Sequence, residues 1–257
     1  MLSWLRPGRR APEPPTPAPA ADHRIYAVGD VHGRHDLLEA LLARLEDDAA
    51  AHDDARQPIL LFVGDLVDRG DHSREVLDLA LRARLTWPQT VVLRGNHEAA
   101  LLDFVEDPER GAAWLGFGGR QTLASYGVPA PGAGAEPPEL HAAAEALAAA
   151  LGAHARFLRE TGLMFRSGDV VFAHSGVDPA RPLDAQGEGA LLWGRSAFLE
   201  AGPPEGLRVV HGHWDDPEPT LTPARINVDT GAYYTGRLTA VRLDDETALI
   251  AVDGLDL

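Results

Sequence analysis

Three short, mostly apolar segments of this chain end in the same way. Residues 25–28, 59–63 and 90–93 are each followed within two residues by Gly and then by Asp or Asn. A short apolar run that stops at Gly is typical of a buried strand. The loops that follow read GDVHG at 29–33, GDLVDRG at 64–70 and RGNHE at 94–98. Because ligand-binding side chains of α/β proteins gather where strands end, these loops predict one shared site.

Helical patterns separate the three predicted strands. Residues 34–48 and 74–85 carry apolar side chains at helical spacing, and a third helix is predicted from Glu98. Ser73 is expected to cap the second helix and Pro88 to close it. Strands that alternate with helices predict an α/β fold that starts with a largely parallel sheet.

The character of the chain changes over residues 107–158. The segment 114–120 is rich in Gly and aromatic residues, but no predicted strand precedes it, which disfavours a dinucleotide-binding role. A loop at 129–138 is followed by an Ala-rich helix predicted over 139–158. We expect residues 107–158 to form a helical insert that covers one rim of the site.

Short strands follow the insert. Residues 163–165 and 170–173 flank a Ser-Gly-Asp turn and predict a hairpin whose second strand ends at His174. The run 207–210 ends at His211, Gly212 and His213. Segments 226–231, 238–243 and 248–252 are predicted to complete an antiparallel or mixed second sheet.

Composition bounds the possible chemistry. The chain has 257 residues, 45% of them hydrophobic, and a formal net charge of −16, which disfavours unspecific binding to nucleic acid or anionic membranes. No apolar run is long enough for a membrane span. The absence of cysteine excludes disulfides, thiolate–metal sites and Cys nucleophiles, and we expect a cytoplasmic protein. Residues 1–22 are predicted to be a disordered Pro/Ala-rich tail and residues 23–257 one domain.

Six candidate metal ligands stand at strand ends: Asp30, His32, Asp65, Asn96, His174 and His213. Carboxylate and amide oxygens mixed with imidazoles suit Mn, Fe or Zn better than Ca or Mg. Asp65 lies on the middle loop, so we expect it to bridge two ions roughly 3.5–4 Å apart. Two such ions would clamp the attacking and leaving oxygens of a displacement and would activate a water as hydroxide.

Four further residues complete the predicted site. His97 follows the candidate ligand Asn96 and is our candidate general acid, with Asp68 holding its ring by a hydrogen bond. Arg69 and Arg195 are the candidate phosphate-binding guanidinium groups. His211 is left open between a supporting and a packing role, and Tyr233 and Tyr234 between lining the rim and packing.

Other site types fail on spacing. The segment His97-Glu98-Ala99-Ala100 begins like a zinc-protease helix, but Leu101 stands where the second His is needed. Ser175 lacks a Gly-x-Ser-x-Gly elbow, and no Gly-rich loop ends in Gly-Lys-Ser/Thr.

With its motifs GDVHG, GDLVDRG and RGNHE in this order, the chain resembles the phosphoprotein phosphatase branch of the calcineurin-like metallophosphoesterases, over roughly residues 24–253. The resemblance implies a four-layer α-β-β-α sandwich with two mixed β-sheets, and two metals, often manganese. It implies that one ion is held by Asp30, His32 and Asp65, and the other by Asp65, Asn96, His174 and His213. The pair His97 and Asp68 would be the acid, and Arg69 and Arg195 would bind phosphate. Trp214 departs from the small hydroxyl residue of bacterial relatives.

Together these features predict a metal-dependent phosphomonoesterase acting on phosphoserine or phosphothreonine in proteins. One alternative is a hydrolase of dinucleoside polyphosphates or other small phosphoesters, although His32 fits the protein-phosphatase-like branch better. A metal-binding scaffold without catalysis is a third reading, which the complete set of candidate ligands disfavours.

Overall fold

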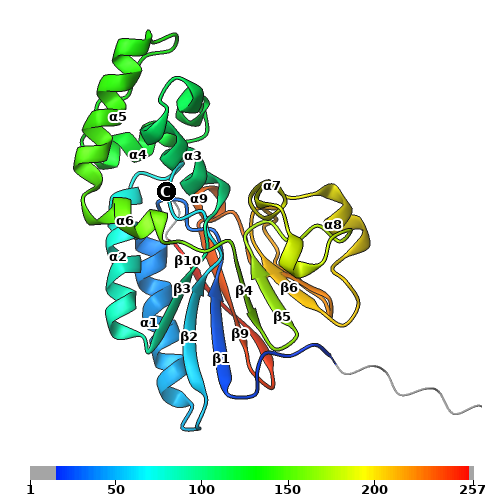
Figure 1. Cartoon of the computed structure of the whole chain (residues 1–257). Coiled ribbons are helices and arrows are strands. Elements are labelled where there is room, and N and C mark those ends of the chain that lie inside the picture. Colours follow the sequence, from blue (N-terminus) through cyan, green and yellow to red (C-terminus); the bar gives the residue numbers. More distant parts are fainter. Residues whose placement is uncertain (1–15, 255–257) are drawn as a thin grey trace, which may run out of the picture.

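Two five-stranded sheets face each other in the computed structural model, which describes residues 16–254 (Figure 1). The first sheet has the strand order β10-β9-β1-β2-β3 and the second β4-β5-β6-β8-β7. The strands of the first sheet are β1 (His23–Val28), β2 (Gln57–Phe62), β3 (Gln89–Val92), β9 (Arg237–Leu243) and β10 (Thr247–Asp253). Those of the second are β4 (Met164–Ser167), β5 (Val170–Ala173), β6 (Arg208–His211), β7 (Thr220–Leu221) and β8 (Arg225–Asn227).

Both sheets are mixed. β1, β2 and β3 are parallel neighbours, as the alternation of strands and helices predicted, and β9 and β10 extend this sheet antiparallel beside β1. In the second sheet β5, β6 and β8 are parallel, and β4 and β7 are antiparallel at its edges. The expectation that 238–243 and 248–252 complete the second sheet was wrong, because β9 pairs with the open edge of β1 instead.

Helices cover the outer faces of both sheets. Figure 1 shows α1 and α2 beside the first sheet and α7 and α8 beside the second. The helices outside the insert are α1 (His35–Ala51), α2 (Ser73–Thr86), α3 (Asn96–Glu106), η2 (Leu183–Ala185), α7 (Glu188–Trp193), α8 (Ser196–Ala201) and α9 (Ala232–Thr235).

Three apolar clusters lie between the resulting layers. Alternate residues of β1 belong to two of these clusters. Tyr26 and Val28 pack toward the helices, and Ile25 and Ala27 pack toward the second sheet. The third cluster joins the outer face of the second sheet to α7 and α8. Period-two alternation puts successive side chains on opposite faces of a strand. The predicted α/β class and four-layer sandwich are therefore confirmed.

The insert between α3 and β4 is helical, with η1 (Arg110–Gly116), α4 (Gly119–Ser125), α5 (Pro137–Leu151) and α6 (Ala153–Arg159). The single helix predicted over 139–158 was wrong, because Gly152 has φ 51° and separates α5 from α6. Ser73 is the first residue of α2 rather than its cap, and its hydroxyl accepts the backbone N–H of Asp68 at 3.0 Å.

The end of the predicted tail contacts the hairpin β4-β5. The backbone N–H of Ala20 donates to Ser167 Oγ at 2.9 Å, and the carbonyl of Ala18 accepts from Asp169 N at 2.9 Å. The rest of the predicted tail, residues 1–15, lies outside the described residues. The division of the chain at residue 22 stays a prediction.

Candidate metal centre

The loops after the parallel strands of both sheets meet at one point. β1, β2 and β3 run in the same direction, so their carboxyl ends bring Asp30, Asp65 and Asn96 to one edge. β5 and β6 deliver His174 and His213 from the second sheet. Seven predicted site residues line one cavity of about 40 Å³: Asp30, His32, Asp65, Arg69, Asn96, His97 and His213.

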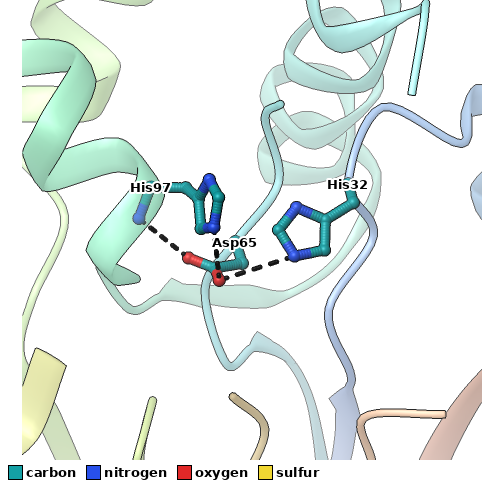
Figure 2. A group of neighbouring side chains, drawn as sticks. All are labelled: His32, Asp65 and His97. Carbon is teal, nitrogen blue, oxygen red and sulfur yellow. Dashed lines mark hydrogen bonds and ion pairs between the residues drawn. The ribbon is translucent and has the colours of Figure 1, made fainter. Parts of the chain in front are cut away.

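Asp65 lies between His32 and His97 (Figure 2). Its Oδ2 atom is 3.6 Å from His32 Nε2, 3.9 Å from His97 Nε2 and 3.4 Å from His174 Nε2. Two sets of possible ligand atoms, each within 4.8 Å of one another, share this carboxylate: one with His32 and His97, the other with His174 and His213. Asp65 is thus the carboxylate that the two sets share, and its bridging of two ions stays a prediction.

Asn96 joins the two histidines that come from the second sheet. Its Oδ1 atom is 2.9 Å from His174 Nε2 and 2.9 Å from His213 Nδ1. Both imidazoles and the amide oxygen therefore point at the same small volume beside Asp65.

Asp30 also lines the cavity. Its Oδ2 atom accepts the backbone N–H of His213 at 3.1 Å, whereas its buried Oδ1 atom has no hydrogen-bond partner within residues 16–254. Burial and the nearby charges of Asp229 and Asp65 raise the pKa of Asp30 well above its ordinary value. A bound cation would give this buried oxygen a partner and would offset the repulsion from the neighbouring carboxylates.

Sequence reasoning missed Asp229 as a site residue. This carboxyl group lines the cavity, is buried, and has a pKa raised to about 6, mainly by burial. It lies two residues after the end of β8, so the strand-end rule that selected the other candidates would also have selected it.

The protonation of three candidate ligands suits a metal. Burial lowers the pKa of His32 to about 3 and that of His213 to about 4. Burial opposes ionisation of Asp65, but the charges of His174 and His97 keep its pKa well below the ordinary value. Neutral imidazoles and an ionised carboxylate are the forms that bind divalent ions, so His32, His213 and Asp65 fit such a group. Burial lowers the pKa of His174, but the charge of Asp65 prevails and raises it, so His174 would release a proton on binding an ion.

Backbone strain is concentrated at this site. Within residues 16–254, five non-glycine residues have positive φ, and all five are predicted site residues: His32 (46°), Asp65 (51°), Asp68 (73°), Arg69 (69°) and His213 (65°). Left-handed conformations are uncommon outside Gly and persist only where surrounding contacts enforce them. The strained backbone at these five residues therefore lowers the stability of the fold, and other contacts must offset this cost.

Glu98 enforces the conformation of two of the loops. Its buried carboxylate accepts four backbone N–H groups, from Gly95, Asp65, Leu66 and Val67, at 2.8, 2.8, 2.7 and 3.2 Å. Gly95 packs so closely on Asp65 that a Cβ atom there would overlap the carboxylate. The RGNHE segment thus ties the loop after β3 to the loop after β2.

A second hydrogen-bonded group lies behind the cavity. His97 Nδ1 is 2.7 Å from Asp68 Oδ2, as predicted, and His97 Nε2 is 3.4 Å from Arg69 Nη2. Asp68 also accepts the indole N–H of Trp114 at 2.7 Å and the hydroxyl of Thr122 at 2.6 Å. Burial lowers the pKa of His97, but the negative charges of Asp65 and Asp68 prevail and raise it. A protonated imidazole beside the cavity can donate a proton there.

The remaining candidates differ in their position relative to the cavity. Arg195 is exposed and is not among the residues that line the cavity, so its phosphate-binding role stays a prediction. Tyr233 lines the cavity, with the guanidinium of Arg69 4.6 Å from its ring centre. His211 is buried against the ring of Phe198, with centroids 5.2 Å apart, outside the cavity.

Residues 23–243 match the family model of the calcineurin-like phosphoesterases. The chain belongs to this family. Its members are metal-dependent phosphoric ester hydrolases, in agreement with the donor set around Asp65 and with the activity predicted from the motifs. No helix between residues 16 and 254 of this family member has the length and hydropathy needed to cross a bilayer.

Proteins similar to this chain include named protein phosphatases and named tetraphosphatases. A segment is 37% identical over 95 residues to "Serine/threonine-protein phosphatase 2" of Escherichia coli, which covers 37% of this chain and 38% of that protein. A bis(5'-nucleosyl)-tetraphosphatase (symmetrical) of Xanthomonas oryzae is 28% identical and covers 91% of this chain and 85% of its own. The crystal structure of a candidate diadenosine tetraphosphatase has the same fold, with a TM-score of 0.60, 23% identity and coverage of 93% and 96% of the two chains.

Proposed function

We propose that this calcineurin-like phosphoesterase is a protein phosphatase that hydrolyses phosphoserine or phosphothreonine with two divalent metal ions. The observation that carries this proposal is the buried pair His97–Asp68 beside the cavity. A serine or threonine alkoxide is a poor leaving group, so its departure depends on a general acid. A phosphoanhydride releases a better leaving group and depends on such an acid less.

The donor set divides into two overlapping groups in this proposal. Asp30, His32 and Asp65 would hold one ion, and Asp65, Asn96, His174 and His213 the other. Manganese is our first candidate, with iron or zinc as alternatives, because the set mixes oxygen and imidazole ligands. When bound, such ions supply positive charge for the phosphoryl oxygens and lower the pKa of a water.

Residues of the chain supply the remaining chemistry. Arg69, in contact with His97 Nε2, would bind the phosphoryl oxygens, together with Arg195. His97 would then donate its Nε2 proton to the leaving oxygen, while Asp68 keeps the ring oriented through Nδ1. Tyr233 contacts both Arg69 and His32 through its ring, and in this proposal it would limit the volume available to the phosphoryl group.

Hydrolysis of a dinucleoside polyphosphate is the second candidate. It is favoured by the match to a named tetraphosphatase along 91% of the chain, whereas the named protein phosphatase matches over 37%. We place either activity in the cytoplasm, as the composition predicted.

The test begins with protein stripped by chelator and reloaded with manganese. Either enzyme is expected to recover turnover of p-nitrophenyl phosphate when metal is added. A lack of turnover with metal bound would instead support a non-catalytic scaffold. The kcat/KM values for a phosphoserine peptide and for diadenosine tetraphosphate are then compared. A preference for the peptide supports the proposal, and a preference for the dinucleotide replaces it with the second candidate.

A further inference from the structure

The loop that carries Asp68 and Arg69 is held by one segment of the insert, residues 114–122. Trp114 lies in η1 and Thr122 lies in α4. Trp114 is 46 residues and Thr122 is 54 residues away from Asp68 in sequence. Both are buried, with exposed fractions of 1% and 0%. The insert therefore supplies part of the structure directly behind the cavity, although no residue of this segment lines it.

Each oxygen of the Asp68 carboxylate has a donor from this segment. Oδ1 accepts the hydroxyl of Thr122 at 2.6 Å, and Oδ2 accepts the indole N–H of Trp114 at 2.7 Å. Oδ2 also binds His97 Nδ1. Hydrogen bonds to both oxygens restrict rotation of the carboxylate about χ2, and so they favour one direction for its bond to the imidazole.

The same segment also contacts the strained backbone of this loop. The Thr122 hydroxyl is 3.0 Å from the backbone N of Asp68 and 3.0 Å from Ser73 Oγ. Gly118, with φ 112°, packs so closely on the backbone N of Arg69 that a Cβ atom would overlap it. Asp68 and Arg69 both have left-handed backbone, which needs such contacts to persist.

We propose that Trp114 and Thr122 are positioning residues, through which the insert orients the carboxylate of Asp68 and so aims the imidazole Nε2 atom at the cavity. This inference rests on the proposed function, since it assigns a task to the support of the general acid. Neither residue touches the substrate. Their effect is expected only in steps that need a correctly aimed proton.

The experiment uses the full chain loaded with manganese and two substrates that differ in leaving group. Departure of p-nitrophenolate needs little protonation, whereas departure of the serine alkoxide from a phosphopeptide needs the acid. Trp114→Phe is expected to lower kcat for the phosphopeptide by roughly 10- to 100-fold, the range for a misplaced catalytic group. The same variant is expected to lower kcat for p-nitrophenyl phosphate less than about threefold, because a correctly aimed proton matters little there.

Two controls separate positioning from packing. Trp87→Phe makes the same change at a buried indole whose N–H has no hydrogen-bond partner within residues 16–254, and wild-type rates on both substrates are expected. Thr122→Val, which removes the hydroxyl, should reproduce the selective loss, and Thr122→Ser, which keeps it, should restore the rate on the peptide. This pair also tests the inference if Trp114→Phe does not fold. Metal content measured by mass spectrometry should equal that of wild type in each folded variant.

Equal loss on both substrates, or no loss on the peptide, would overturn the inference. His97→Asn distinguishes this failure from failure of the proposed function. Wild-type peptide turnover in His97→Asn would show that His97 is not the general acid, and would contradict the proposed function. Suppose that His97→Asn loses peptide turnover selectively, whereas Trp114→Phe and Thr122→Val do not. This result would contradict only the positioning role of the insert.

Discussion

Replacing Glu98 by Gln should strongly destabilise the metal-free protein. Each oxygen of this carboxylate accepts two backbone N–H groups: Oε2 those of Gly95 and Asp65, and Oε1 those of Leu66 and Val67. In Gln one oxygen becomes an NH₂ group, so two N–H donors lose their acceptor in either orientation of the amide.

The magnitude follows from these bonds. Hydrogen bonds to a charged group contribute about 1.5–3 kcal/mol each, so losing two costs about 3–6 kcal/mol. Burial and the charge of Asp65 raise the pKa of Glu98, and removing that buried charge offsets part of the loss. We expect the free energy of unfolding to fall by about 2–4 kcal/mol, which is a large fraction of the roughly 5–15 kcal/mol of a typical domain.

Urea denaturation of the metal-free protein measures this change. The matched control is Glu106→Gln, which makes the same substitution at an exposed position of the same helix, and its unfolding free energy should stay within about 0.5 kcal/mol of wild type. A loss below about 1 kcal/mol for Glu98→Gln would contradict an ionised carboxylate with four N–H donors. It would mean that Glu98 is already protonated in the folded protein.

Three further predictions concern the site and the core. His97→Asn should keep its manganese, measured by mass spectrometry, and lower kcat on a phosphoserine peptide by roughly 10²–10⁴-fold. Asp65→Asn should retain fewer metal ions per chain than wild type after dialysis, whereas Asp103→Asn, an exposed change on α3, should retain the wild-type number. Burial lowers the pKa of His211 from 6.5 to about 3. Between these two pH values the unfolded chain binds more protons than the folded chain, so protonation favours unfolding. In urea titrations of metal-free protein, stability relative to His211→Gln should therefore fall as pH decreases below 6.5, by up to about 1.4 kcal/mol per pH unit, and parallel pH profiles would contradict this.

Local patterns determined much of this protein. Apolar runs ending in Gly marked β1, β2 and β3, and helical spacing marked α1, α2 and α3, because burial of one face imposes these periods on the sequence. The same runs located the oxygen and imidazole donors, since strand ends of a parallel sheet meet at one edge. Six residues that line the cavity therefore lie in three short motifs of the sequence: Asp30, His32, Asp65, Arg69, Asn96 and His97.

Contacts between distant segments were decided only by the tertiary structure. The strands β9 and β10 were recognisable as strands, but their place beside β1 depends on which sheet edge is open, and no local pattern records that. The four N–H bonds of Glu98 and the donors that Trp114 and Thr122 supply to Asp68 likewise need loops brought together from far apart in the chain. A sequence specifies which side chains are available as ligands and donors. Their geometry follows from the packing of the layers, because hydrogen bonds and strained backbone persist only where several elements enforce them together.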